Sequence, residues 1–206
     1  MRLGSFLLAI VLAQANAFAA PPPRRAADPD WPCEQLLVPH LTAASYWSGP
    51  LDTAGNWQDD KAVAALVARI SPRRVTTEEG LAEIDAFAKR VTTNRAPRLA
   101  LLFRGLLETT DRTRARLIDE LKGIGRRQRE LAALVARLRT QLDAIPPDAT
   151  GAAAAQRVDL QQRHDFSARN FDEIQRTIRY ACEAPVELDA RLGAWARALQ
   201  KAATAP

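Results

Sequence analysis

The sequence predicts an all-α fold: a helical bundle built on a long antiparallel helical hairpin, with shorter helices before it and one helix after it. Apolar residues recur at helical spacing from about residue 59 onward, and no window alternates long enough to predict a sheet. Two long segments, about 111–144 and 152–183, also share one heptad rhythm. A turn separates these segments, so they are expected to pack antiparallel.

The chain starts with the features of a cleaved signal peptide, which we assign to residues 1–20. A positive start is followed by a short apolar run and small residues, and cleavage is expected near Ala19 and Ala20. The run is too short to be a permanent anchor, and no later segment is apolar enough to span a membrane. We therefore expect a periplasmic or secreted protein, with residues 21–32 as an extended leader rich in Pro, Ala and Arg.

The charge of the chain is mildly basic. The formal net charge is +5, and loss of residues 1–20 removes Arg2 and no acid, which leaves about +4. Export argues against nucleic acid as the partner of this excess, and leaves an acidic envelope protein, peripheral contact with an anionic membrane, or plain solubility. The mature length suits one helical domain over 33–203, divided into an aromatic segment (33–58), short helices (59–109), the hairpin (111–183) and a C-terminal helix (186–202).

Cys33 and Cys182 are the only cysteines in the sequence. In a reducing cytosol they would be interpreted as two small buried residues. In the oxidising compartment that a signal peptide implies, an even count favours a structural disulfide. Its loop of about 150 residues corresponds to about 4–5 kcal/mol of stabilisation in the chain-entropy model. The sequence has no C-x-x-C motif, which argues against a thiol oxidoreductase of thioredoxin type.

Aromatic residues are concentrated before the regular helices. We expect their rings to fasten an otherwise coreless segment onto the helices, with Cys33 locking it, and a ligand cleft is the alternative. A short helix is expected from about Thr42 to Trp47, with Thr42 as its N-cap. The aromatic candidates for a binding surface are Trp31, Tyr46, Trp47 and Trp57.

Three short helices are expected over residues 59–109. The first ends at Ser71-Pro72, the second opens with a capping box from Thr76 to Glu79, and the third begins near Pro97. Their expected buried residues are Val63, Leu66, Val67 and Ile70; then Leu81, Ile84, Phe87, Ala88 and Val91; then Leu99, Leu102, Phe103, Leu106 and Leu107.

The hairpin is the longest pattern in the sequence. Its apolar positions alternate steps of four and three, so each segment needs a partner helix along its length. Pro146-Pro147 ends the first segment, and whether that segment joins the helix near Pro97 or breaks near 109–111 stays open. Folding about the turn matches Leu138 with Leu160, Leu131 with Ser167, Ile124 with Ile174 and Leu117 with Ala181.

A final helix is expected to begin near Pro185. Its buried stripe is Leu188, Leu192, Trp195 and Leu199. The hairpin register puts Cys182 near the open end of the hairpin, so the segment around Cys33 must reach that end if the disulfide forms.

No pattern of residues points to a metal, a cofactor or a catalytic group. His40 and His164 are the only histidines, which excludes a His-rich metal site, and no C-x-x-C-H motif exists for covalent haem. His164, Asp165 and Ser167 adjoin in sequence, but neighbours on a helix point to different faces. No G-x-S-x-G motif surrounds a serine.

Two further features have structural interpretations. Gly123 and Gly125 lack the strand and the lysine of a phosphate-binding loop, and are expected to permit close helix packing or a slight kink. Gln128 and His164 occupy heptad seam positions, where polar residues more often set the register than bind ligands.

A basic surface is the second candidate for recognition. It lies in the first half of the long segment, and the pairing of some of its residues with Asp119, Glu120 and Glu130 is the alternative explanation for it. The candidates are Arg112, Arg116, Arg126 and Arg127, with Arg114, Lys122 and Arg129 among them.

These observations favour an exported, non-enzymatic helical interaction or accessory protein whose partner is another envelope protein. The alternative is a protein that binds a small ligand or a cell-envelope polymer through residues 31–57 and neighbouring arginines. An enzyme with an unrecognised site is a third class, and a bundle fold alone does not choose among the three.

Overall fold

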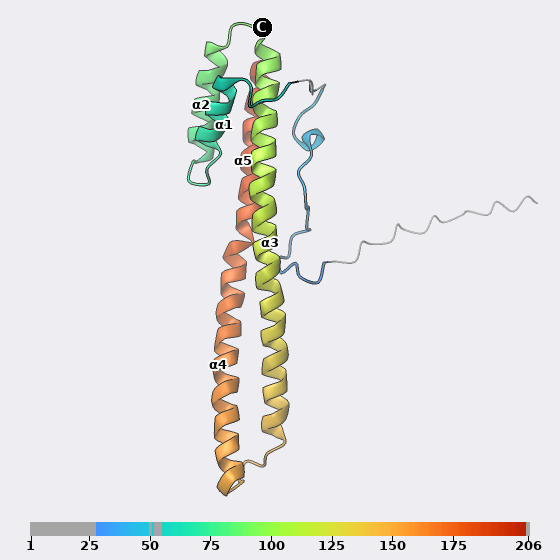
Figure 1. Cartoon of the computed structure of the whole chain (residues 1–206), viewed down its shortest axis with the longest axis vertical. Coiled ribbons are helices and arrows are strands. Elements are labelled where there is room, and N and C mark those ends of the chain that lie inside the picture. The colour runs from blue at the N-terminus through green and yellow to red at the C-terminus, as the bar shows by residue number, and fades with distance from the viewer. Residues whose placement is uncertain (1–27, 50, 52–54, 205–206) are drawn as a thin grey trace, which may run out of the picture.

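A single helix of 49 residues, α3 (Arg95–Asp143), forms the axis of an elongated molecule (Figure 1). At 1.5 Å per residue it is about 74 Å long. The computed structural model describes residues 28–49, 51 and 55–204, so the predicted signal peptide and most of the leader lie outside the described residues. The described residues contain helices and no strand, which confirms the all-α class.

Two consecutive helices run antiparallel to α3 and together match its length. Helix α4 (Gly151–Ala181) returns from the turn, and α5 (Glu183–Thr204) continues in nearly the same direction after Cys182. The predicted hairpin is therefore confirmed, and Leu138 and Leu160 lie in one buried cluster as the register requires. Because α5 extends the return path, Cys182 lies along the side of the rod rather than at the end of the molecule.

The predicted third helix and the first hairpin segment are parts of one helix. No proline or glycine interrupts residues 106–122, and the polar side chains at the suspected break are engaged without breaking the backbone. Thr113 donates its hydroxyl to the carbonyl of Thr109, and Asp111 accepts a hydrogen bond of 2.7 Å from the backbone amide of Leu41.

We call the end of the rod where α3 lies beside α5 the proximal half. It contains the main core. Helices α1 (Lys61–Ile70) and α2 (Thr77–Arg90) pack there against α3 and α5 respectively. The capping box of Thr76 and Glu79 is formed as predicted. The core contains the predicted stripes of these helices together with Leu192, Trp195 and Leu199 of α5. Leu81 and Leu107 are only half-buried at its edge.

An extended segment precedes α1 and runs beside α3; we call residues 28–42 the strap. The helix predicted from Thr42 to Trp47 is a single 3-10 turn, η1 (Ala43–Ser45). Thr42 does not cap it, because its hydroxyl contacts the hydroxyl of Ser45 at 2.9 Å instead of a backbone amide.

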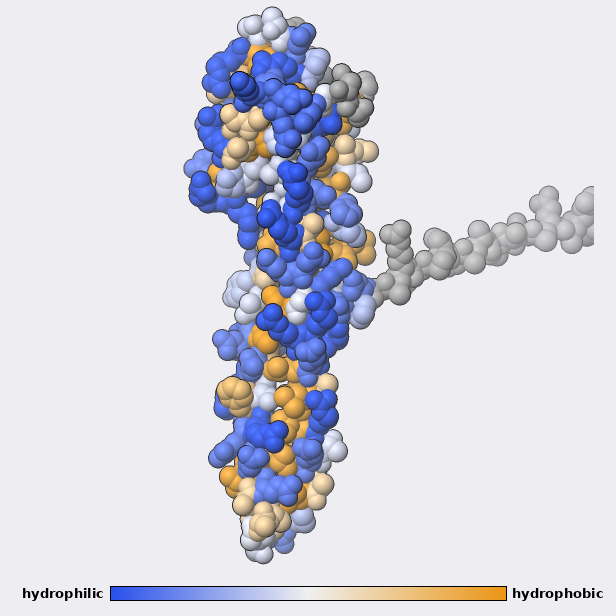
Figure 2. Space-filling view, viewed as in Figure 1, coloured by the Kyte–Doolittle hydropathy of each residue, from blue (hydrophilic) through white to orange (hydrophobic). Residues whose placement is uncertain are grey.

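The distal half of the rod consists of α3 and α4 alone. We call residues 130–173 the distal hairpin. Its buried residues are Leu138, Leu142, Leu160 and Ser167, and the other apolar positions of its seam are half-buried. Figure 2 shows apolar side chains along the line where the two helices meet in this half. The long seam therefore has one partner helix and no third layer within the described residues.

Candidate functional site

Two of the predicted aromatic surface residues belong to the core. Trp47 is 9% exposed and stacks on Phe103, with ring centroids 5.0 Å apart. Trp57 is 8% exposed, and its indole donates a hydrogen bond of 2.8 Å to Glu108. Burial of such large rings anchors the segment before α1 to the helices.

The other two aromatic residues are partly buried and hydrogen-bonded. The hydroxyl of Tyr46 donates a hydrogen bond to Asp189 of α5. Burial is the main cause of a raised pKa for Tyr46, and this hydrogen bond is the second cause. Trp31 donates from its indole nitrogen to the carbonyl of Gln35 at 2.7 Å. All four aromatic candidates thus contribute to packing of the N-terminal segment.

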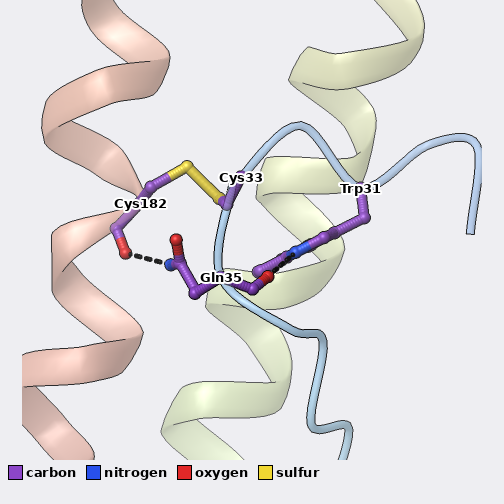
Figure 3. Close-up of a disulfide and its surroundings, with 4 residues drawn as sticks. All are labelled: Trp31, Cys33, Gln35 and Cys182. Carbon is purple, nitrogen blue, oxygen red and sulfur yellow. Dashed lines mark hydrogen bonds between the residues drawn. A yellow bond between two sulfur atoms is a disulfide. The ribbon is translucent and has the colours of Figure 1, made fainter. Parts of the chain in front are cut away.

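The disulfide joins the strap to the junction of α4 and α5 (Figure 3). The Cα atoms of Cys33 and Cys182 lie 5.7 Å apart, which is normal for a disulfide. Gln35 adds a hydrogen bond of 2.7 Å from its amide to the carbonyl of Cys182. The chain crosses α3 to reach this point, so the strap contacts both helices of the rod.

The basic surface of α3 holds the acidic start of the strap. Lys122 pairs with Asp28 at 2.8 Å, Arg126 pairs with Asp30 at 2.9 Å, and Arg129 also pairs with Asp30. These bonds lower the pKa of both aspartates. The sequence suggested Asp119, Glu120 and Glu130 as partners of the basic residues. The salt bridges of Lys122, Arg126 and Arg129 instead join α3 to the strap.

Among the remaining basic candidates, Arg112, Arg114 and Arg116 precede Lys122 on α3, and Arg127 lies next to Arg126. Arg112, Arg116 and Arg127 are exposed, and Arg112 makes only a long hydrogen bond of 3.4 Å to Thr109. Arg114 is buried and donates to the carbonyl of Val38 in the strap. Four of the basic residues therefore hold the strap: Arg114, Lys122, Arg126 and Arg129. The other three, Arg112, Arg116 and Arg127, are exposed.

Gly125 has a more specific role than the sequence indicated. The carbonyl oxygen of Asp30 lies so close to it that a Cβ at this position would overlap the oxygen. The glycine thus admits the backbone of the strap, rather than another helix. Gly123, two residues earlier, has open space around it.

A groove of about 670 Å³ lies beside the disulfide, where the strap meets the helices. It is lined by strap, α3, α4 and α5 residues, among them Gln35, Gln128, Gln175, Ile178 and Arg179.

A second groove, of about 370 Å³, lies between α3 and α4 in the distal hairpin, and we call it the distal groove. It is lined by Ala132, Val135, Ala136, Arg139, His164, Ala168, Phe171 and Asp172. The lining is mainly apolar, and its charged edge residue Arg139 bonds Asp143 at 3.1 Å.

The two grooves are successive parts of one furrow. Val135 follows Gln128 by seven residues on α3, while Ala168 and Asp172 precede Gln175 and Arg179 by seven on α4. In a two-stranded coiled coil, residues seven apart face the same way. The strap partly fills the furrow near the disulfide, and the distal groove is its uncovered continuation.

His164 lies at the edge of the distal groove, half-buried at its predicted seam position. Its Nδ1 lies 3.1 Å from Asp165, so these sequence neighbours do interact, and the contact lowers the pKa of Asp165. Ser167 is buried at the seam. In the described part of the chain no three His, Cys, Asp or Glu side chains gather as metal ligands.

The distal groove was not predicted from the sequence, because it exists only where no other described element covers the seam between α3 and α4. Two signals could have indicated it: a heptad seam longer than the elements available to cover it, and alanines at 132, 136 and 168 beside that seam.

Comparison with known proteins identifies no function for this chain. Searches against family models, curated proteins and solved structures found no match to this chain. Among the helices that the structure describes, none combines the length and the apolar character needed to cross a bilayer.

Proposed function

We propose that this chain is an exported, non-enzymatic interaction protein that presents the distal groove to another envelope protein. The observation that carries the proposal is the uneven cover of the rod. The proximal half buries its seam beneath α1, α2 and the strap, whereas the distal groove leaves Val135 and Phe171 half-buried. An apolar groove between two helices is a kind of surface that partner proteins use for docking.

Two features support an envelope location. The first twenty residues have the pattern of a cleavable signal peptide. The disulfide between Cys33 and Cys182 suits an oxidising compartment, since such bonds rarely persist in the cytosol. The exposed arginines near the proximal half offer a further contact for an acidic partner or an anionic membrane surface.

The proposal is tested by matched substitutions on adjacent residues of α3. Both residues are exposed, but Ala132 lines the distal groove and Ala133 does not. Both variants, Ala132→Glu and Ala133→Glu, make the same change in the same helix. In the native host, chemical crosslinking should trap wild type and Ala133→Glu in one complex of defined mass, and should fail for Ala132→Glu. A chain that remains alone in all three cases contradicts the proposal.

A second candidate function is supported by the groove beside the disulfide. Its amides, from Gln35, Gln128 and Gln175, and the guanidinium of Arg179 could orient a small polar ligand or a polymer segment. Trp31 belongs to the adjacent cluster, so binding there should change its fluorescence. A screen of envelope glycans and small metabolites that yields neither quenching nor a thermal shift would count against this function.

A further inference from the structure

We propose that the occupant of the distal groove is an amphipathic α-helix of the partner, lying along the furrow as a third helix. This inference rests on the proposed function and specifies the partner's chemistry: a helix with a narrow apolar stripe and no requirement for acidic anchors.

The furrow already accepts a third chain at one end. There the strap lies on α3 at Gly125 and reaches α4 through the disulfide. The distal groove begins one heptad further along α3, at Ala132, and on α4 its Ala168 lies one heptad beyond Gln175 of the groove beside the disulfide. A partner placed there would extend an interface that the chain itself has built, rather than create a separate one.

The contacts that hold the extended strap do not recur in the distal groove. Gly125 is followed seven residues later by Ala132, whose Cβ prevents the same close approach of a backbone carbonyl. Arg126 and Arg129 are followed seven residues later by Ala133 and Ala136, which cannot pair with carboxylates. An acidic extended segment like the strap is thus poorly suited to this position.

A helix meets the requirements that an extended chain does not. An extended occupant needs partners for its backbone amides and carbonyls, but the groove offers mainly apolar side chains. Its polar lining groups are few: Arg139, which bonds Asp143, His164, which contacts Asp165, and the exposed carboxylate of Asp172. A helix satisfies its own backbone, and small residues such as alanine allow helices to approach closely.

The size and charge of the surface define the partner further. The lining from Ala132 to Arg139 covers two helical turns, so a partner helix would contact it through apolar residues at positions such as i, i+3, i+4 and i+7. The distal hairpin carries five arginines and seven acidic residues, a net charge of −2. That balance does not select an acidic partner, so apolar complementarity is the main determinant.

A photocrosslinking experiment on the full chain tests the inference. Benzoylphenylalanine replaces Ala132, Ala136 or Ala168 in turn, with Ala133 as the outward-facing control, and the protein is expressed and irradiated in its native host. Mass spectrometry then identifies the partner residues attached to each position. The inference predicts adducts from the three groove positions, at least tenfold more than from Ala133, at partner residues spaced by three, four or seven.

Each other outcome has a defined meaning. Adducts at partner residues spaced by two would show an extended occupant and overturn the inference, while the proposed function would stand. Adducts to a second copy of this chain would show that the chain self-associates through the groove, and would overturn the inference of a separate partner protein. Absence of groove adducts, with the complex still forming in Ala132→Glu, would overturn the inference and the proposed use of this groove together.

Discussion

Asp60 shows how one residue can connect two helices. Its carboxylate accepts hydrogen bonds from the amides of Ala62 and Val63 at the start of α1, and it also binds Arg98 of α3 through two nitrogens. The bond from Arg98 is the main cause of a lowered pKa for Asp60. The local start signal of α1 is therefore also a tertiary contact.

Substitution of Asp60 should reveal this contact through its pH dependence. Asp60→Asn keeps an oxygen that can cap α1 but removes the charge that binds Arg98, at a cost of about 1 kcal/mol at neutral pH. Because folding lowers the pKa, the stabilisation is complete above the ordinary value of 3.8 and is lost as the pH falls through the lowered pKa.

Urea unfolding at pH 7 and at progressively lower pH measures the effect. The gap in unfolding free energy between wild type and Asp60→Asn should shrink in acid. Asp59→Asn, at the exposed neighbouring position, is the control and should change little. A gap for Asp60→Asn that stays constant down to the acid transition would contradict the assignment.

At the scale of elements, contacts with α3 determine the path of the strap more than the strap's own sequence does. It has no regular secondary structure, and it is attached through two aspartates, Trp31 and Cys33, and through the backbone of Val38 and Leu41, which bond Arg114 and Asp111 of α3. At Gly125 its backbone passes so close to the helix that a Cβ would overlap the carbonyl oxygen of Asp30.

Two glycine substitutions separate helix propensity from strap binding. Gly123→Ala should stabilise the protein by about 1 kcal/mol, because alanine favours the helix and the surroundings are open. Gly125→Ala gains the same propensity, but its Cβ overlaps Asp30 and should cost about 1–3 kcal/mol. Limited proteolysis after Glu34 in the strap should be faster only in Gly125→Ala. Equal protection of both variants would show that the strap does not depend on this approach.

At the scale of the whole molecule, the disulfide closes the largest loop. Cys33 and Cys182 are 149 positions apart, so their bond ties the strap to the junction of α4 and α5. The Cys33→Ser, Cys182→Ser double variant should lose about 2–5 kcal/mol of unfolding free energy. Guanidinium unfolding of the oxidised wild type and of the cysteine-free double variant would check this, and coincident midpoints would show that the disulfide contributes no stability.

The sequence was sufficient where structure follows from local or periodic signals. The capping box at Thr76 and the stop at Ser71-Pro72 located α1 and α2 closely, and the heptads predicted the hairpin register. The cysteine pair was inferred from its even number and the leader. The helix signals involve neighbouring residues or strict repeats, so no tertiary information was needed for them.

Other features depended on contacts between distant segments. The strap has no periodicity, so its path over Gly125 and its pairing with Lys122 could not be predicted from spacing. The continuity of α3 was open because two different patterns, one nearly all apolar and one heptad, meet within one helix. The distal groove exists because no described element reaches the end of the seam.

The most direct test of this uneven construction is hydrogen–deuterium exchange on the free, full-length protein. The account predicts that amides of the distal hairpin exchange by local opening at least about tenfold faster than those of α5 and of residues 99–121, because fewer side chains bury them. Slow exchange that is uniform along the whole of α3 would contradict it, since the distal hairpin would then be complete without a partner.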